Sequence, residues 1–140
     1  MSVAAVVTLS CALVACYSVR SKPDVVGFYE LKAGHDLINL EIAPDDRFTE
    51  TIQWASGKVE KRTGTWQLNN GFLGFDELWI PKSFAPDYIL QADAESGPNR
   101  PKYTAPGHWT LSAESHWGTI IMPIFPDADI NFKKVAHSSR

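Results

Sequence analysis

Acidic side chains on neighbouring predicted strands are the first residues of this 140-residue sequence that could do chemistry. They are Glu30, Glu50 and Glu60, together with Asp76-Glu77, which follow an aromatic stretch. Paired carboxyl groups carry out acid and base catalysis only where burial raises the pKa of one while the other stays ionised. The sequence does not show such burial, and solvated strand faces explain the same pattern. We therefore expect a protein that is not an enzyme.

The remaining reactive residues form no recognisable metal-binding set. Asp127-x-Asp129-x-Asn131 begins like an EF-hand loop, but its sixth and twelfth positions hold Phe132 and Ser138 in place of Gly and Glu. The histidines lack the helical i, i+4 spacing and the Cys or carboxylate partners typical of zinc ligands, so each is expected in a turn or on the surface. We predict no metal and no cofactor. The histidines are His35, His108, His116 and His137.

Aromatic side chains are abundant, with five Trp, four Tyr and seven Phe. In a small β-domain such residues form the core, line an apolar pocket or provide a carbohydrate platform. We expect most of the tryptophans in the core and keep a subset of aromatics as candidates for contacts with a small apolar ligand. These candidates are Trp54, Trp66, Phe84, Tyr88, Tyr103 and Trp109.

Short β-prone segments separated by turn residues must position these side chains. Apolar residues alternate with polar ones in 36–43 and again in 47–54, with Pro44-Asp45-Asp46 as the turn between them. Asn69-Asn70-Gly71 is a strong hairpin signal, because Asn and Gly tolerate positive φ. Gly64 predicts a bulge or a close approach of two backbones. The predicted strands are 26–31, 36–43, 47–54, 59–68, 72–80, 108–115, 118–123 and 130–135.

About eight antiparallel strands predict an all-β meander in a single domain over 25–136, followed by a short C-terminal tail at 137–140. Such a meander forms either a small closed barrel, filled by side chains or holding one small ligand, or a half-open sandwich. Both architectures produce the same alternation of apolar and polar residues, so the sequence does not decide between them. The formal charge of −3 creates no field that would attract nucleic acid, so nucleic-acid binding is disfavoured.

A Pro-rich interruption at 81–107 separates the predicted strands, and it exceeds the usual length of loops in compact domains, about 12 to 15 residues. The stretch 84–90 is too apolar to stay solvated, so we expect it to pack over one end of the barrel as a short helical turn, whereas 94–102 is expected to be mobile. Two interpretations remain. The segment is a lid or binding loop carrying Phe84, Tyr88 and Tyr103, or it is a crossover that closes the core.

Three short motifs resemble small lipocalin-like bacterial lipoproteins of unknown role. They are Gly27-Phe28-Tyr29-Glu30-Leu31, then Leu40-Glu41-Ile42 before Pro44-Asp45-Asp46-Arg47-Phe48, and Gly64-Thr65-Trp66. The family progression is G-x-Y, L-x-L-x-x-D-G-x-F and G-x-W, and Arg47 stands where those proteins usually carry Gly. The resemblance covers about residues 26–68 and implies a lipocalin-like barrel.

The N-terminal residues resemble a lipoprotein export signal. Residues 3–14 form an apolar run too short to cross ~30 Å of hydrocarbon. Leu13-Val14-Ala15-Cys16 resembles the lipobox, in which the cysteine is acylated and becomes the new N-terminus. The resemblance implies a signal peptide over 1–15, lipidation at Cys16, a tether over 16–24, and a location on the bacterial envelope, at the periplasmic face of the outer membrane. Secretion without a lipid and an uncleaved apolar helix are the alternatives.

Two non-enzymatic functions follow from these observations. The first is a membrane-anchored binding domain for a small apolar ligand in the barrel mouth. The second is a protein-interaction or structural envelope module with a filled core. An enzyme that uses strand carboxylates would need two of them to converge in a cleft.

Overall fold

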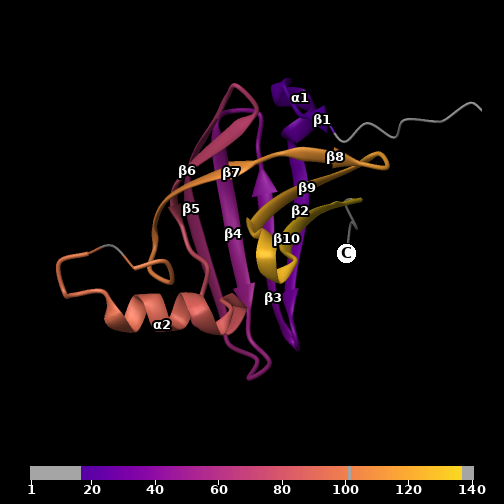
Figure 1. The fold of residues 1–140 in the computed structure, drawn as a ribbon. Helices are drawn as coiled ribbons and strands as arrows, with labels where there is room; N and C mark the ends of the chain where they lie inside the picture. Colours follow the sequence, from indigo (N-terminus) through magenta and orange to yellow (C-terminus); the bar gives the residue numbers. More distant parts are fainter. Residues whose placement is uncertain (1–16, 101, 137–140) are drawn as a thin grey trace, which may run out of the picture.

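The computed structural model describes residues 17–100 and 102–136, so the predicted signal peptide, Cys16 and the tail at 137–140 lie outside the described residues. The described chain folds into one ten-stranded antiparallel sheet in the order β1-β8-β9-β10-β2-β3-β4-β5-β6-β7 (Figure 1). The elements are β1 (Tyr17–Ser18), α1 (Lys22–Val25), β2 (Gly27–Ala33), β3 (Asp36–Ile42), β4 (Arg47–Gln53), β5 (Val59–Asn69), β6 (Phe72–Leu78), η1 (Lys82–Phe84), α2 (Asp87–Glu95), β7 (Gly107–Ser112), β8 (Glu114–His116), β9 (Thr119–Phe125), η2 (Pro126–Ala128) and β10 (Ile130–Val135).

The predicted all-β meander is confirmed. Strands β2 to β7 pair in chain order, and β10 returns to pair with β2, which brings Lys133 opposite Glu30. Each predicted strand has a counterpart, but the segment predicted as one strand over 108–115 is divided between β7 and β8. The division falls at the point where the strand changes partners, from β6 to β9.

Ala113 closes the sheet into a nearly complete barrel. Its N–H donates to the Gly71 carbonyl at 3.3 Å, and its own carbonyl accepts from Val19 N at 2.9 Å. The extended chain from β7 through Ala113 to β8 therefore connects the two ends of the sheet. β7 is the last strand in the sheet order, and β8 pairs with β1, the first. Inside, the Trp109 and Phe125 rings meet edge to face at 6.0 Å, across β7 and β9. A strand that bends and changes partners is how curled sheets turn a corner.

Gly64 lies where the backbones of β5 and β6 come close together. A Cβ atom on Gly64 would lie 2.2 Å from the Asp76 carbonyl oxygen and 2.6 Å from the Phe48 ring. The close backbone approach predicted for this glycine is therefore confirmed. It lets the long strand β5 pair first with β4 and then with β6.

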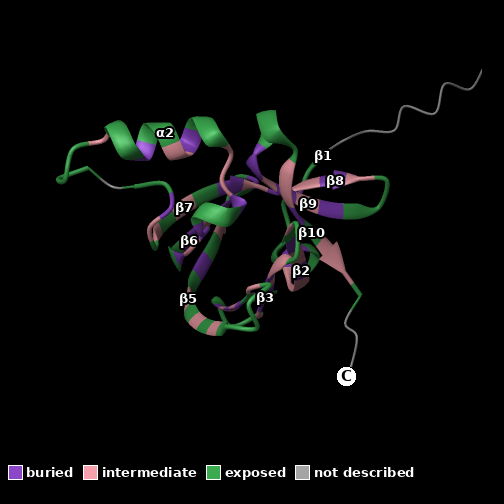
Figure 2. Ribbon diagram, turned by 90° about the horizontal axis from the view of Figure 1, so that it is seen from below, coloured by how far each residue is buried: buried purple, intermediate pink, exposed green. Residues whose placement is uncertain are grey.

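The N-terminal segment, whose residues up to 24 were predicted as a tether, closes one end of the barrel. Tyr17 and Ser18 pair with β8, Val19 is buried, and α1 inserts the fully buried Val25 into the core. The Tyr29 hydroxyl donates to the Val25 carbonyl at 2.5 Å. Figure 2 shows buried residues along the strands, whereas α2 is largely exposed.

The 81–107 segment closes the opposite end, as predicted. Phe84 in η1 is 1% exposed and belongs to the core, and η1 contacts β2. The segment is not one irregular loop, because 87–95 forms α2, whose buried residues are Ile89 and Asp93. Within the described residues, no helix has the length and hydropathy needed to span a bilayer.

Candidate ligand-binding site

A groove of about 440 Å³ lies at the barrel end that η1 closes. Trp54 directly follows β4, Trp79 directly follows β6, and their ring centroids are 6.0 Å apart at an angle of 57°. Both side chains are only partly buried. We call this the barrel-end groove. Its lining residues are Trp54, Ser56, Lys58, Trp79, Pro81, Lys82, Ser83 and Thr104.

The turn between β4 and β5 positions Trp54. Its N–H donates to the Lys58 carbonyl at 2.9 Å, and Gly57 returns a bond to the Trp54 carbonyl at 2.8 Å with φ of 85°. Asp36 accepts from Ala55 N at 2.8 Å and ties this turn to β3. The bonds from Ala55 and from the Ser83 side chain hold the pKa of Asp36 below its usual value. The wall that carries Trp54 is therefore braced from a neighbouring strand.

A bulge in β6 positions Trp79. The register shifts between Phe75 and Leu78, and Glu77 takes a positive φ of 69°. The bulge resets the alternation, so that Leu78 becomes buried and Trp79 is placed at the rim. The ring is then fixed by Nε1, which donates to the Thr104 carbonyl at 2.8 Å.

Asp93 on α2 holds the chain that supports Trp79. Its carboxylate accepts bonds from Tyr103 N at 2.7 Å, Thr104 N at 3.0 Å and Thr104 Oγ1 at 2.6 Å. Burial alone would raise the pKa of Asp93, but these bonds outweigh it and lower the pKa. A carboxylate that accepts several hydrogen bonds is a strong anchor for a loop. The Thr104 carbonyl is therefore held where it meets the indole.

Glu50 lies behind the groove in the barrel core and is 0% exposed. Its Oε2 accepts from Trp79 N at 3.2 Å, whereas its Oε1 and the Nε of Arg62 are buried without a hydrogen-bond partner. Burial raises the pKa of Glu50 to about 8, although the Trp79 bond and the charge of Arg62, its cross-strand neighbour, oppose the rise. Burial therefore favours the protonated form of Glu50.

Cations surround the two tryptophan rings. Lys58 Nζ lies 4.8 Å from the centre of the Trp54 ring, and the Arg62 guanidinium lies 5.4 Å from that of Trp79. Lys58 and Arg62 are also within 3.5 and 3.6 Å of Glu60, whereas Lys82 lines the groove from η1. The groove thus offers flat apolar surfaces beside positive charge. That combination suits a compact ligand with a planar or apolar body and an anionic group.

A second groove, of about 950 Å³, lies between α2, the chain that returns from it, and β7. It brings together two of the predicted ligand contacts, Tyr103 and Trp109, beside His108 and Thr110. The His108 Nδ1 is 2.8 Å from Asp76 Oδ1, and this bond lowers the pKa of Asp76. Both partners are more than half exposed, which screens their attraction.

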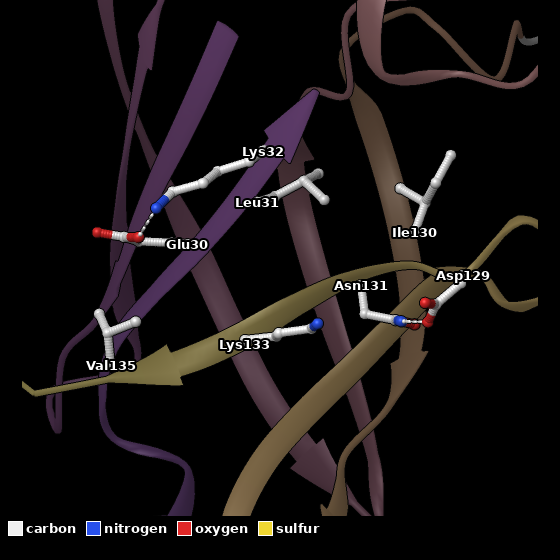
Figure 3. Close-up of a pocket in the computed structure, with 8 residues that line it drawn as sticks. All are labelled: Glu30, Leu31, Lys32, Asp129, Ile130, Asn131, Lys133 and Val135. Carbon is white, nitrogen blue, oxygen red and sulfur yellow. Dashed lines mark hydrogen bonds and ion pairs between the residues drawn. The ribbon is translucent and has the colours of Figure 1, made fainter. Parts of the chain in front are cut away.

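A third cavity, of about 360 Å³, lies between β2 and β10, whose pairing ends at Glu30 and Lys133 (Figure 3). Its polar side chains are largely engaged with one another. Glu30 pairs with Lys32 at 3.1 Å, and Asn131 donates to Asp129 at 2.7 Å. We therefore regard the barrel-end groove, which is lined by two partly exposed tryptophans and by Lys58 and Lys82, as the candidate site.

The structure divides the predicted ligand contacts. Trp66 is 2% exposed and donates through Nε1 to the Ala43 carbonyl at 2.9 Å, and Phe84 is buried, so both belong to the core. Tyr88 is exposed on α2, away from the residues that line the barrel-end groove. Only Trp54 of the predicted set lines that groove. Its partner Trp79 was not predicted, although the consecutive polar residues Asp76-Glu77 are a signal for the bulge that positions it.

The candidate carboxylates do not converge in an open cleft. Glu50 and Glu60 lie on the neighbouring strands β4 and β5, where Arg62 is paired opposite Glu50 and lies 3.6 Å from Glu60, but neither carboxylate lines the barrel-end groove. Glu30 pairs with Lys32, and Asp76 is exposed and pairs with His108. Among residues 17–100 and 102–136, no group of three or more His, Cys, Asp or Glu side chains is placed to hold a metal ion.

No family model and no curated protein matches the chain. Among solved structures, a lipocalin-like protein from Bacteroides uniformis is similar with a TM-score of 0.45 and 12% sequence identity, over 80% of this chain and 99% of that chain. An uncharacterized protein from Bacteroides eggerthii is similar with a TM-score of 0.42 and 15% identity, over 79% of this chain and 98% of that chain.

Proposed function

We propose that the chain is a lipid-anchored protein of the bacterial envelope whose barrel binds a small ligand without catalysing a reaction. The observation that carries the proposal is the barrel-end groove, in which Trp54 and Trp79 meet Lys58 and Lys82. Its volume falls within the usual range for small-molecule sites, roughly 300 to 1,000 Å³. The lipobox-like sequence supports anchoring through Cys16, at the periplasmic face of the outer membrane.

The ligand that fits the groove has a planar or apolar body and an anionic group. Stacking on indole favours the body, and the lysine ammonium groups favour the anion. Side chains of the core occupy the barrel axis, with Phe84 and Val25 closing its two ends, so the ligand binds at the barrel end and not in a central cavity. Binding without catalysis is supported by Glu50, which is buried and is not among the residues that line the groove.

Titration with 1-anilinonaphthalene-8-sulfonate, a planar aromatic anion, tests the groove. We expect Trp54→Ala to weaken binding about fivefold or more, since an aromatic contact contributes on the order of 1 kcal/mol. The double variant Lys58→Ala, Lys82→Ala should weaken it by a similar factor, whereas Lys61→Ala, an exposed lysine of β5, should not. Equal affinity of the native chain and Trp54→Ala would contradict the proposal.

A second candidate function is a protein-interaction or structural envelope module. It is favoured by the plugging of both barrel ends by buried side chains. Native mass spectrometry of the protein isolated from the envelope separates the two. An adduct of a few hundred daltons, lost with Trp54→Ala, supports the groove, whereas co-purification of a protein without such an adduct supports the module.

A further inference from the structure

The tip of the β8–β9 hairpin presents Trp117 to solvent. Its side chain is 83% exposed, more than any other large hydrophobic side chain of the described residues. Trp117 and Gly118 are the two residues between the strands, with φ of 51° and 81°. A two-residue turn with positive φ at both positions favours Asn-Gly, and a bulky side chain is strained there. Neither conformation nor solvation therefore explains a tryptophan at this position.

The same hairpin lies beside the start of the described chain. Tyr17 pairs with Ser115 and Ser18 with Glu114, so β1 runs antiparallel to β8 and its N-terminal end is the end nearest the tip. Cys16 is joined to Tyr17 by one peptide bond. Ser115, the partner of Tyr17, is two residues from Trp117 in the chain. An acyl anchor on Cys16 would hold the hairpin tip close to the bilayer surface.

We propose that Trp117 inserts into the headgroup region of the membrane on which Cys16 anchors the protein. The inference rests on the lipid anchoring proposed above. Tryptophan is enriched at the membrane–water interface, because its ring is apolar and its N–H can bond to water or headgroups. An unfavourable residue at a turn is then explained by a contact outside the domain.

A second point of attachment would fix the orientation of the domain. An acyl chain alone leaves a domain free to rotate about its tether, whereas an anchor and a tryptophan some distance apart restrict that rotation. The barrel-end groove lies at the end closed by η1, opposite the end closed by α1 (Figure 1). Insertion of Trp117 would keep the groove turned toward the periplasm and accessible to ligand.

Quenching by brominated lipid tests the insertion directly. The full chain is reconstituted in phosphatidylethanolamine and phosphatidylglycerol vesicles, with and without bromine on the acyl carbons nearest the glycerol. We expect the bromine to remove on the order of a fifth of the tryptophan emission, since Trp117 is one of five tryptophans. Trp117→Asn should abolish the quenching while the protein still sediments with the vesicles. Trp54→Phe, at the other end of the barrel, should leave it unchanged.

Each failure has its own signature. In one outcome the native protein sediments with the vesicles, but its tryptophan emission is equal in brominated and unbrominated vesicles. This outcome overturns the insertion, leaves the anchoring intact and assigns Trp117 to a protein partner. Native protein that stays in the supernatant, as Cys16→Ser is expected to do, overturns the anchoring and the insertion together. Folding does not confuse the result, because Asn suits this turn and should keep or raise the melting temperature.

Discussion

At the residue scale, Glu50 shows how strongly position in a barrel changes a side chain's chemistry. It lies on the inward face of β4 between the buried residues Phe48 and Ile52. Burial penalises the charged carboxylate and keeps it protonated, with one oxygen bonded to Trp79 N and the other without a partner. The residue therefore links the core to the rim of the barrel-end groove through a bond to backbone, not through charge.

Glu50→Gln should flatten the pH dependence of stability. The pKa of Glu50 is about 8 in the folded chain against an ordinary value of 4.5, so the folded state holds an extra proton between these values. Its contribution to stability is complete below the lower pKa and is lost as pH rises toward the upper one, at a slope of up to about 1.4 kcal/mol per pH unit. Urea unfolding of the native chain and the variant between pH 5 and pH 8 measures the difference.

A matched control for this experiment is Glu41→Gln, on the exposed side of β3. It should retain the pH dependence of the native chain. Parallel pH profiles for the native chain and Glu50→Gln would show that the carboxyl group is solvated in the folded protein.

Sequence patterns located such residues only in part. Glu50 lies at an alternate position between Phe48 and Ile52, so the alternation along the strand predicts that its side chain points inward. Its charge, however, favours a solvated position. Trp79 was missed for a different reason, because the bulge at Glu77 shifts the phase by one residue. Simple alternation therefore identifies inward positions within a regular strand and fails after a bulge.

At the element scale, α2 is a support whose inward contacts come from one apolar and one acidic residue. Ile89 and Asp93 are four residues apart and are its buried positions. The Asp93 carboxylate accepts the three hydrogen bonds that hold the chain returning from α2. The Thr104 carbonyl of that chain in turn accepts the hydrogen bond from Trp79 Nε1. A helix that buries so little apolar surface shows no apolar stripe, so the sequence predicted only a short helical turn here.

Asp93→Ala should loosen the returning chain. Three donors lose their acceptor, and each unsatisfied buried donor costs about 1 to 3 kcal/mol. We expect the amides of Tyr103 and Thr104 to exchange hydrogen at least tenfold faster, with little change in the central strands. Asp87→Ala, in the exposed first turn of α2, is the control and should leave both amides as protected as before. Equal exchange in both variants would refute this role of Asp93.

At the scale of the whole molecule, the barrel is closed by covers at both ends. α1 brings Val25 to one end and η1 brings Phe84 to the other, and both side chains are buried. Strand alternation predicted the meander, because it depends only on neighbouring residues in the chain. Closure could not be predicted in the same way, since it depends on Ala113 changing partners and on pairing between distant strands.

Phe84→Ala should destabilise the whole domain. Removing a buried phenylalanine typically costs about 3 to 5 kcal/mol, because a cavity remains in the core. Tyr88→Ala, four residues along the same segment and exposed, should change the free energy of unfolding by less than about 0.5 kcal/mol. Urea denaturation compares the two. Unchanged stability with new binding of an apolar dye inside the barrel would instead identify Phe84 as a lid over a cavity.

The pairing of β10 with β2 sets an order of events during synthesis. It joins the last strand of the described chain to one of the first, so β2 remains an unpaired edge until the C-terminal residues have been made. Contacts between residues far apart in sequence form slowly, after the local hairpins. The barrel is therefore completed only after β10 has been made.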